Sequence, residues 1–252
     1  MNAITSVLGH LVRNDVRLIA RDKMLATMTV VVLCMGVGMR YALPALDTAL
    51  ADAGVMPSAS SSLRFSDTFP AFVVFVALWQ GANFPGIVFG FVLLGEKEDN
   101  TLEAMRVTPL SLKRYAGYRV AVSAAAAFVI IVYLVLAVGI AQLPLLQLLV
   151  FAAGASLAAP LSVLAYATFA DNKIQGLAYT KFGGLAGLLI LVGYFVPDPW
   201  QWLLGAFPPF LVAKGYWMAL EGNSAAVWPL LLGVFLQVAL IRLLLRRLNA
   251  AT

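Results

Sequence analysis

Residues that carry covalent or metal chemistry are scarce in this chain. Its 252 residues include one cysteine, Cys34, and one histidine, His10. A single cysteine excludes a disulfide within the chain, and one cysteine with one histidine cannot supply the ligands of a Cys/His zinc site. The sequence also lacks an H-E-x-x-H motif and a G-x-x-x-x-G-K-[ST] phosphate-binding loop. We therefore predict no metal, no catalytic residue and no cofactor bound by the chain itself.

Charged residues are scarce as well. They make up 12% of the sequence and hydrophobic residues 62%, whereas a soluble domain is about one-quarter charged. Several apolar runs are long enough to cross the roughly 30 Å hydrocarbon layer of a bilayer as helices. Six such segments lie near residues 24–46, 69–94, 117–141, 146–169, 176–196 and 225–245. The sequence therefore predicts an all-α polytopic membrane protein with a single transmembrane domain across residues 1–252.

The distribution of basic residues predicts the orientation. With six spans both termini lie on one side, and only Arg40, Arg64 and Lys214 of the 17 basic residues then lie on the other. Because cytoplasmic loops carry the excess of Lys and Arg, we expect both termini in the cytoplasm, in the cell inner or plasma membrane. The net charge of +5 therefore indicates contact with a membrane and not binding to nucleic acid. The first span could instead be a cleaved signal peptide with its site at 49–51, but its charged leader and its length oppose this.

Two further helical elements are expected outside the spans. The first is an amphipathic interfacial helix at about residues 6–22, with arginines toward the headgroups and apolar residues toward the acyl chains. Its apolar face would hold Leu8, Val12, Val16 and Ile19, and its basic face Arg13, Arg17 and Arg21. The alternative is a cytoplasmic extension of the first span. The second element is the aromatic and proline-rich region 197–224, which predicts two short re-entrant helices broken at Pro208–Pro209.

Few polar residues lie inside the spans. Asp and Glu are missing from the interior of all six, which argues against proton relays. Gln80 and Asn83 share one face of the second span, just before Pro85. They either form helix–helix hydrogen bonds beside a kink or, together with Phe84, line a substrate path. Gly183, Gly184 and Gly187 predict a small-residue face on the fifth span.

A polar interval at residues 91–115, FVLLGEKEDNTLEAMRVTPLSLKRY, separates the second and third spans. Asn100 and Glu103 have the spacing of a capping box, and Pro109 disfavours helix at Thr108, so a short helix is expected from Thr101 to about Val107. On it, Leu102 and Met105 share an apolar face, and Glu103 and Arg106 share a polar one. We expect Lys113, Arg114 and Arg119, at the start of the third span, to anchor at the headgroups. The interval is either a rigid helix that transmits motion from a cytoplasmic partner into the second and third spans, or a solvated loop.

The stretch GEKEDNTLEAMRVTPLS resembles the signature of permease subunits of type-2 ATP-binding cassette (ABC) exporters. The matching positions are Glu96, Glu98, Thr101, Leu102, Glu103, Thr108, Pro109, Leu110 and Ser111. Asn100 departs from the glycine of many relatives but keeps the capping role. The resemblance extends loosely to the whole chain, including FPPF at 207–210.

The resemblance implies a coupling helix that binds a separate cytoplasmic ATPase subunit, which would also bind ATP and Mg²⁺. Leu102 and Met105 would be its buried anchors, and Glu96 and Glu98 would face basic residues of the N-terminal helix or of the ATPase. The residues expected at this interface are Glu96, Glu98, Asn100, Thr101, Leu102, Glu103, Met105, Arg106, Thr108 and Pro109.

The implied function is export of a hydrophobic or amphiphilic compound, drug-like or lipid-like. The pore would require a second permease chain, identical or related, with a substrate path that includes Gln80, Asn83 and Phe84. One alternative is a membrane anchor or sensor that recruits a cytoplasmic partner without transport. Another, a lipid-modifying enzyme, lacks a cluster of acid, base and nucleophile.

Overall fold

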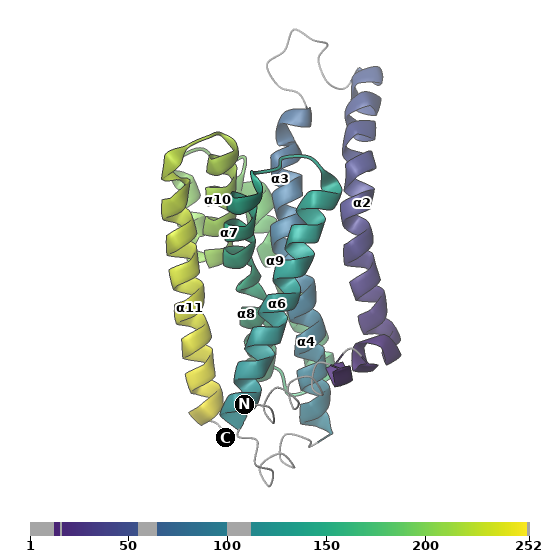
Figure 1. Ribbon diagram of the computed structural model, residues 1–252, viewed down its shortest axis with the longest axis vertical. Coiled ribbons are helices and arrows are strands. Elements are labelled where there is room, and N and C mark those ends of the chain that lie inside the picture. Colours follow the sequence, from purple (N-terminus) through teal and green to yellow (C-terminus); the bar gives the residue numbers. More distant parts are fainter. Residues whose placement is uncertain (1–12, 16, 55–64, 100–111, 251–252) are drawn as a thin grey trace.

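The computed structural model describes residues 13–15, 17–54, 65–99 and 112–250, and their regular secondary structure is entirely helical (Figure 1). The long helices are α2 (Lys23–Asp52), α4 (Gly81–Glu98), α6 (Leu112–Val138), α9 (Lys173–Gly193) and α11 (Val227–Ala250). Between them lie α3 (Phe69–Val74), α7 (Leu145–Ser156), α8 (Ala158–Phe169) and α10 (Pro208–Leu220). Short 3₁₀ segments occupy Phe65–Thr68, Trp200–Ala206 and Ser224–Ala226, and Phe75–Gln80 is π-helical.

The described residues form six helical segments that are long and apolar enough to cross a membrane. They are Lys23–Asp52, Phe65–Glu98, Tyr115–Val138, Leu145–Phe169, Lys173–Gly193 and Ser224–Arg247. Each coincides with one predicted span, so this part of the fold prediction is confirmed. The largest difference is in the first span, which continues through Pro44 to Asp52.

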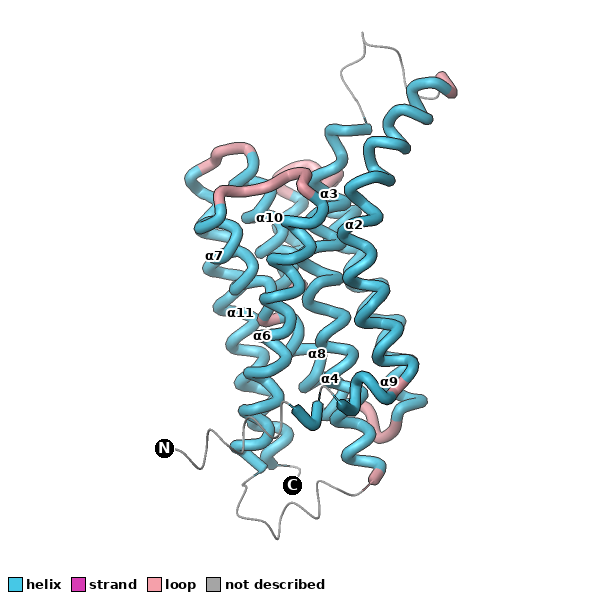
Figure 2. The backbone as a smooth tube through the Cα atoms, turned by 45° about the vertical axis from the view of Figure 1, so that its right-hand side comes forward, coloured by secondary structure: helices cyan, strands magenta, loops and turns pink. Residues whose placement is uncertain are grey.

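The second span is the centre of the bundle. In its most apolar stretch 78% of the residues are buried, against 17% in the first span and 22% in the fifth. It packs against α2, α6, α8 and α9, whereas α2 and α11 form opposite edges (Figures 1 and 2). The first and fifth spans therefore present wide apolar faces that the described residues do not cover, including Tyr41 and Phe182.

Two of the spans are not continuous α-helices. The fourth divides into α7 and α8 at Leu157. Pro160 explains the break, because its ring has no N–H for the carbonyl of Ser156 and clashes with that carbonyl in a regular helix. The second span contains the π-helical turn Phe75–Gln80, which inserts an extra residue and is followed by Pro85.

Glycines allow the fifth span to approach the core closely. A Cβ built at Gly187 would lie 1.9 Å from Trp79 Nε1, and one at Gly176 would lie 2.6 Å from Leu94 Cδ1. The predicted small-residue face is thus correct for Gly187, whereas a Cβ at Gly184 would meet nothing within 4 Å. A Cβ at Gly183 would lie 3.5 Å from Asn83 Oδ1, so the packed face runs through Gly176, Gly183 and Gly187.

The N-terminal helical residues, 13–15 and 17–21, form a segment separate from the first span. Asp22 has extended backbone angles, and its Oδ1 accepts hydrogen bonds from the N–H groups of Met24 (2.9 Å) and Leu25 (3.2 Å). It therefore caps α2, and a continuous extension of the first span is not what the structure shows. Ile19, expected to face acyl chains, instead packs against core residues of α4, α6 and α8.

Two helical segments occupy the region between the fifth and sixth spans. The 3₁₀ segment Trp200–Ala206 ends at Phe207, whose backbone is extended, and α10 begins at Pro208. Prolines are favoured at this first helical position because their missing N–H has no partner there in any helix. Phe210 and Tyr216 of α10 are fully buried. Entry of these segments into the outer leaflet stays a prediction.

Candidate coupling site

The expected ATPase-binding residues fall into two groups, those before Asp99, which are described, and those after it, which are not. Asn100, Thr101, Leu102, Glu103, Met105, Arg106, Thr108 and Pro109 lie outside the described residues. Glu96 and Glu98 belong to the last turn of α4 and are described. The site can therefore be built from the stem of the predicted coupling helix, meaning the end of α4 and the start of α6.

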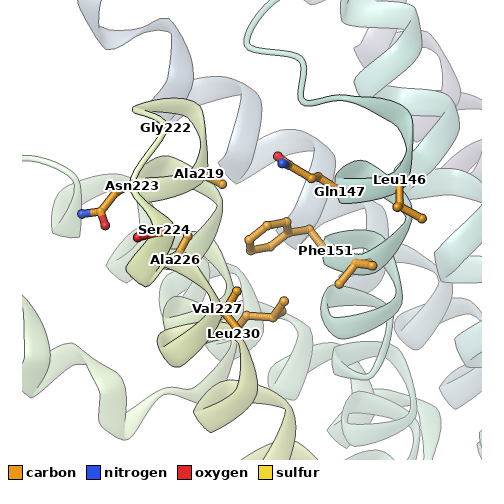
Figure 3. A pocket seen from close by; sticks show the side chains of 11 residues that line it. Leu146, Gln147, Phe151, Ala219, Gly222, Asn223, Ser224, Ala226, Val227 and Leu230 are labelled. Carbon is orange, nitrogen blue, oxygen red and sulfur yellow. The ribbon is translucent and has the colours of Figure 1, made fainter.

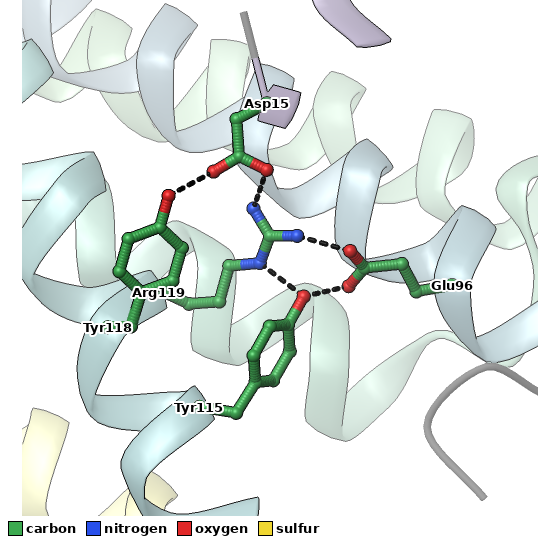
Figure 4. Close-up of polar contacts among 5 residues, drawn as sticks. All are labelled: Asp15, Glu96, Tyr115, Tyr118 and Arg119. Carbon is green, nitrogen blue, oxygen red and sulfur yellow. Dashed lines mark hydrogen bonds and ion pairs between the residues drawn. The ribbon is translucent and has the colours of Figure 1, made fainter. Parts of the chain in front are cut away.

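Arg119, on the third turn of α6, lies at the centre of a buried polar cluster (Figure 4). Its Nη2 donates to Glu96 Oε1, its Nη1 donates to Asp15 Oδ1 at 2.8 Å, and its Nε donates to the Tyr115 hydroxyl at 2.6 Å. The Tyr115 hydroxyl in turn donates to Glu96 Oε2. Each guanidinium nitrogen therefore has an acceptor, as a buried cation requires.

Tyr118 completes the cluster on the side of the N-terminal helix. Its hydroxyl donates to Asp15 Oδ2 at 2.6 Å, so both oxygens of Asp15 have a donor. The rings of Tyr115 and Tyr118 lie 5.0 and 5.7 Å from the Arg119 guanidinium carbon. At these distances each ring face attracts the cation and also excludes water.

The burial of the cluster makes its charges interdependent. The side chains of Arg119 and Asp15 are only 3% and 5% exposed, and that of Glu96 is 17% exposed. Coulomb attraction is much stronger at such a site than in water, and desolvation is costly for any charge left alone. Arg119 therefore needs a carboxylate partner, and the two acids can be buried side by side because Arg119 lies between them.

This arrangement corrects two expectations. Arg119 was predicted to reach the headgroups, but it is 2% exposed and points into the protein. Glu96 was expected to face basic residues of the N-terminal helix or of an ATPase, yet its cation comes from α6. The N-terminal helix supplies an acid, Asp15, which the sequence analysis did not single out.

The two residues after Glu96 bind a different part of the chain. Lys97 Nζ lies 3.0 Å from Asp171 Oδ1 and donates to the Ala170 carbonyl at 3.1 Å. Glu98 Oε1 accepts from the N–H of Lys173 at 2.7 Å. The end of α4 is therefore tied to the turn between α8 and α9, while Glu96 ties it to α6.

Three consecutive residues, Glu96, Lys97 and Glu98, thus hold the end of α4 to α6 and to the turn before α9. They contain no nucleophile beside a base, and no group of His, Cys, Asp or Glu in the described ranges could hold a metal ion. The polar contacts at this site therefore serve to fix the position of one segment relative to others.

The predicted substrate-path residues lie half a span away. Asn83 is buried, and its Nδ2 is 3.5 Å from Gln80 Oε1, while Phe84 packs against the central core. Asn83 Oδ1 faces α9, since a Cβ at Gly183 would lie 3.5 Å from it. This contact joins two residues of one span, so it is not the helix–helix hydrogen bonding of the first alternative, and a role of the pair in a substrate path stays a prediction.

Sequence reasoning missed Trp79, which precedes this pair in the π-helical turn. Its Nε1 is buried without a hydrogen-bond partner among the described residues, and its ring packs edge-to-face on Phe207 at 5.0 Å. The hydrophobic pattern of the second span does not reveal the π-helical turn in which Trp79 lies, so this residue was not singled out.

An open groove of about 340 Å³ lies at the opposite end of the bundle, between α7 and the start of α11 (Figure 3). Its walls include Leu146, Gln147 and Phe151 on one side and Ala226, Val227 and Leu230 on the other. Among the described residues, its walls contain none of the predicted substrate-path or coupling residues.

Comparison with known proteins identifies relatives over nearly the whole chain. Residues 15–245 match the family described as fluoroquinolones export permease protein Rv2686c-like. The chain is 28% identical over 259 residues to the fluoroquinolones export permease protein Rv2686c of Mycobacterium tuberculosis strain ATCC 25618 / H37Rv. It is equally similar to the fluoroquinolones export permease protein MT2760 of strain CDC 1551 / Oshkosh, and each alignment covers 99% of both chains. No solved structure matches the chain.

Proposed function

Because this chain belongs to the Rv2686c-like fluoroquinolones export permease family, and so to the permease subunits of ABC transporters, we propose that it exports drug-like compounds from the cell. The cargo would be a hydrophobic or amphiphilic molecule, with a fluoroquinolone as the first candidate, since the relatives are named for these compounds. The chain acts as a transport subunit and forms no covalent bond with its cargo.

The energy comes from a separate ATPase subunit that binds ATP and Mg²⁺. Support for this comes from the sequence, which has no phosphate-binding loop. The segment 100–111 binds the ATPase as a short coupling helix, with Leu102 and Met105 as its apolar anchors, because central apolar residues usually contribute most to an interface. Both termini and this segment then lie in the cytoplasm, as the placement of the basic residues requires.

The observation that best supports this function is the stem at Glu96–Glu98. A loop that serves topology alone needs no fixed attachment, but this one starts from residues paired with α6, with the turn before α9 and, through Arg119, with the N-terminal helix. Motion imposed on the segment would reach several spans at once. Such a connection suits an element that transmits force.

The transport path lies where two permease chains meet. The second copy, identical or related, covers the apolar faces of the first and fifth spans, which are the least buried of the six. Gln80, Asn83 and Phe84 lie on the second span beside α9 and contribute polar and aromatic contacts to the path. The segments Trp200–Ala206 and Pro208–Leu220 re-enter the outer leaflet, with the exposed Trp200 and Trp202 at the interface, whereas Trp217 is buried in the protein.

The decisive experiment changes Leu102 and Met105 together to glutamate. Vesicles that contain the permease and its co-expressed ATPase should then lose most ATP-dependent fluoroquinolone transport, because buried apolar anchors usually account for most of the affinity of an interface. Membrane insertion, checked by the amount of protein in the membrane fraction, should stay at the wild-type level.

Changing the exposed Leu146 to serine is the control, since this residue lies at the start of α7, outside the first and fifth spans where the second copy is proposed to bind. Unchanged transport in the double variant would contradict the coupling helix. A wild-type chain that binds an ATPase but moves no compound would favour an anchor or sensor.

A further inference from the structure

We propose that Arg119 and Asp15 are positioning residues that join the N-terminal helix to the stem of segment 100–111, so that the helix and the stem move as one unit during transport. This inference rests on the proposed function, in which that segment receives motion from the ATPase. It adds a role for two residues that lie outside the segment and outside the resemblance to exporter permeases.

The first argument is the placement of the cluster around the segment. Glu96 lies four residues before residue 100, and Tyr115 lies four residues after residue 111. Both are hydrogen-bonded to Arg119, and also to each other. One guanidinium therefore binds both ends of the segment, and the end of α4 cannot shift relative to α6 without breaking these bonds.

The second argument is that Arg119 also binds a residue of the N-terminal helix that is distant in sequence. Asp15 is separated from Arg119 by 104 residues in sequence, yet both of its oxygens are bound by α6 side chains. Most of the N-terminal helix is exposed, including Arg13, Arg17 and Arg21. Asp15 and Ile19 provide its buried contacts among the residues described, so Asp15 is its main polar attachment to the bundle.

The third argument is the choice of charged groups. Apolar side chains could bury the same surface, but they tolerate sliding, because dispersion and hydrophobic contacts have little directional preference. A buried guanidinium with two carboxylates and two hydroxyls demands one geometry, and each partner is costly to leave unpaired. The cluster is therefore suited to hold segments in a fixed register and to change only between formed and broken states.

The opposite end of the bundle offers a control. Lys214 of α10 is also buried, but its partners Asp198 and Gln201 are near it in sequence and belong to the segment before α10. Loss of Asp198 should weaken the fold locally without touching the stem. A variant there separates a loss of stability from a loss of coupling.

The test compares Asp15→Asn, Arg119→Lys and Asp198→Asn in the full chain, reconstituted with its ATPase in liposomes. Asn keeps the size of Asp15 and its oxygen acceptor, and Lys keeps the charge of Arg119 but cannot reach three acceptors. Efflux of a fluoroquinolone and ATP hydrolysis are measured on the same liposomes. The quantity compared is the number of molecules moved per ATP hydrolysed.

We expect both cluster variants to hydrolyse ATP while efflux per ATP falls at least about fivefold, the lower end of the usual range for coupling between sites. Asp198→Asn should leave efflux per ATP at the wild-type value. The proposal is overturned if both cluster variants keep the wild-type ratio, or if Asp198→Asn lowers it equally. Absence of ATP-dependent efflux in the wild-type protein would instead reject the proposed function.

Discussion

Arg119 and Lys214 are both buried cations, but the chain holds them in different ways. Arg119 lies near the start of α6, at the end of the bundle where α4 ends, and α10 with Lys214 lies at the other end (Figure 1). Arg119 is bound by Asp15, Glu96 and Tyr115, which come from three segments. Lys214 is bound by Asp198 at 2.8 Å, by Gln201 and by the ring of Trp202 at 4.8 Å.

The two sites also differ in how far their acids are removed from water. The Asp198 side chain is 66% exposed, whereas those of Asp15 and Glu96 are 5% and 17% exposed. Water can solvate Asp198 if its partner is lost, but it cannot easily reach Asp15. A buried charge with local, exposed partners stabilises one turn of chain, whereas a charge with distant, buried partners makes several segments depend on one another.

The largest effect is expected from Arg119→Met, which tests the difference between the two sites most directly. The change leaves Asp15 and Glu96 buried without a cation, which typically costs about 3–5 kcal/mol. We expect the free energy of unfolding, measured by titration with SDS in mixed micelles, to fall by that amount. Arg119→Lys should lose less, because one charge remains. A loss below about 1 kcal/mol in Arg119→Met, the size typical of an exposed pair, would show that the cluster is not a stabilising tie.

An intermediate effect is expected from Lys214→Met. The variant keeps the apolar contacts of the side chain, and the released Asp198 is largely in water, so the loss should be about 1–3 kcal/mol, typical of a charge-assisted hydrogen bond. The same SDS titration measures it. If Lys214→Met proved as costly as Arg119→Met, exposure of the partner acid would not explain the difference between the two sites.

The smallest effect is expected at the exposed pair of Lys97 and Asp171. Their side chains are 38% and 81% exposed, and such pairs usually contribute about 0.2–1 kcal/mol. Lys97→Gln should therefore change the unfolding free energy little, and the change should shrink further as salt is raised. A loss comparable to that of Arg119→Met would show that the stem depends on the turn before α9 as strongly as on α6.

The spans could be predicted because bilayer thickness sets their length and composition. Six apolar runs gave six helical segments with ends close to those expected. The short helix expected from Thr101 to about Val107 lies outside the described residues and stays a prediction. The π-helical turn at Phe75–Gln80 could not be anticipated, since it depends on how Trp79 fits against Gly187 and Phe207. Asp15 could not be identified either, because its partner lies 104 residues away.

The sequence by itself determined the class of this protein, its six spans and the segment expected to meet an ATPase. The class and the spans follow from composition and hydrophobic length, whereas the contact of the segment with an ATPase is implied by its resemblance to exporter permeases. The tertiary structure alone decided the direction in which Arg119 points. An arginine near the end of a span can reach the headgroups or turn inward, and only the presence of Asp15, Glu96 and Tyr115 around it makes the inward position the stable one.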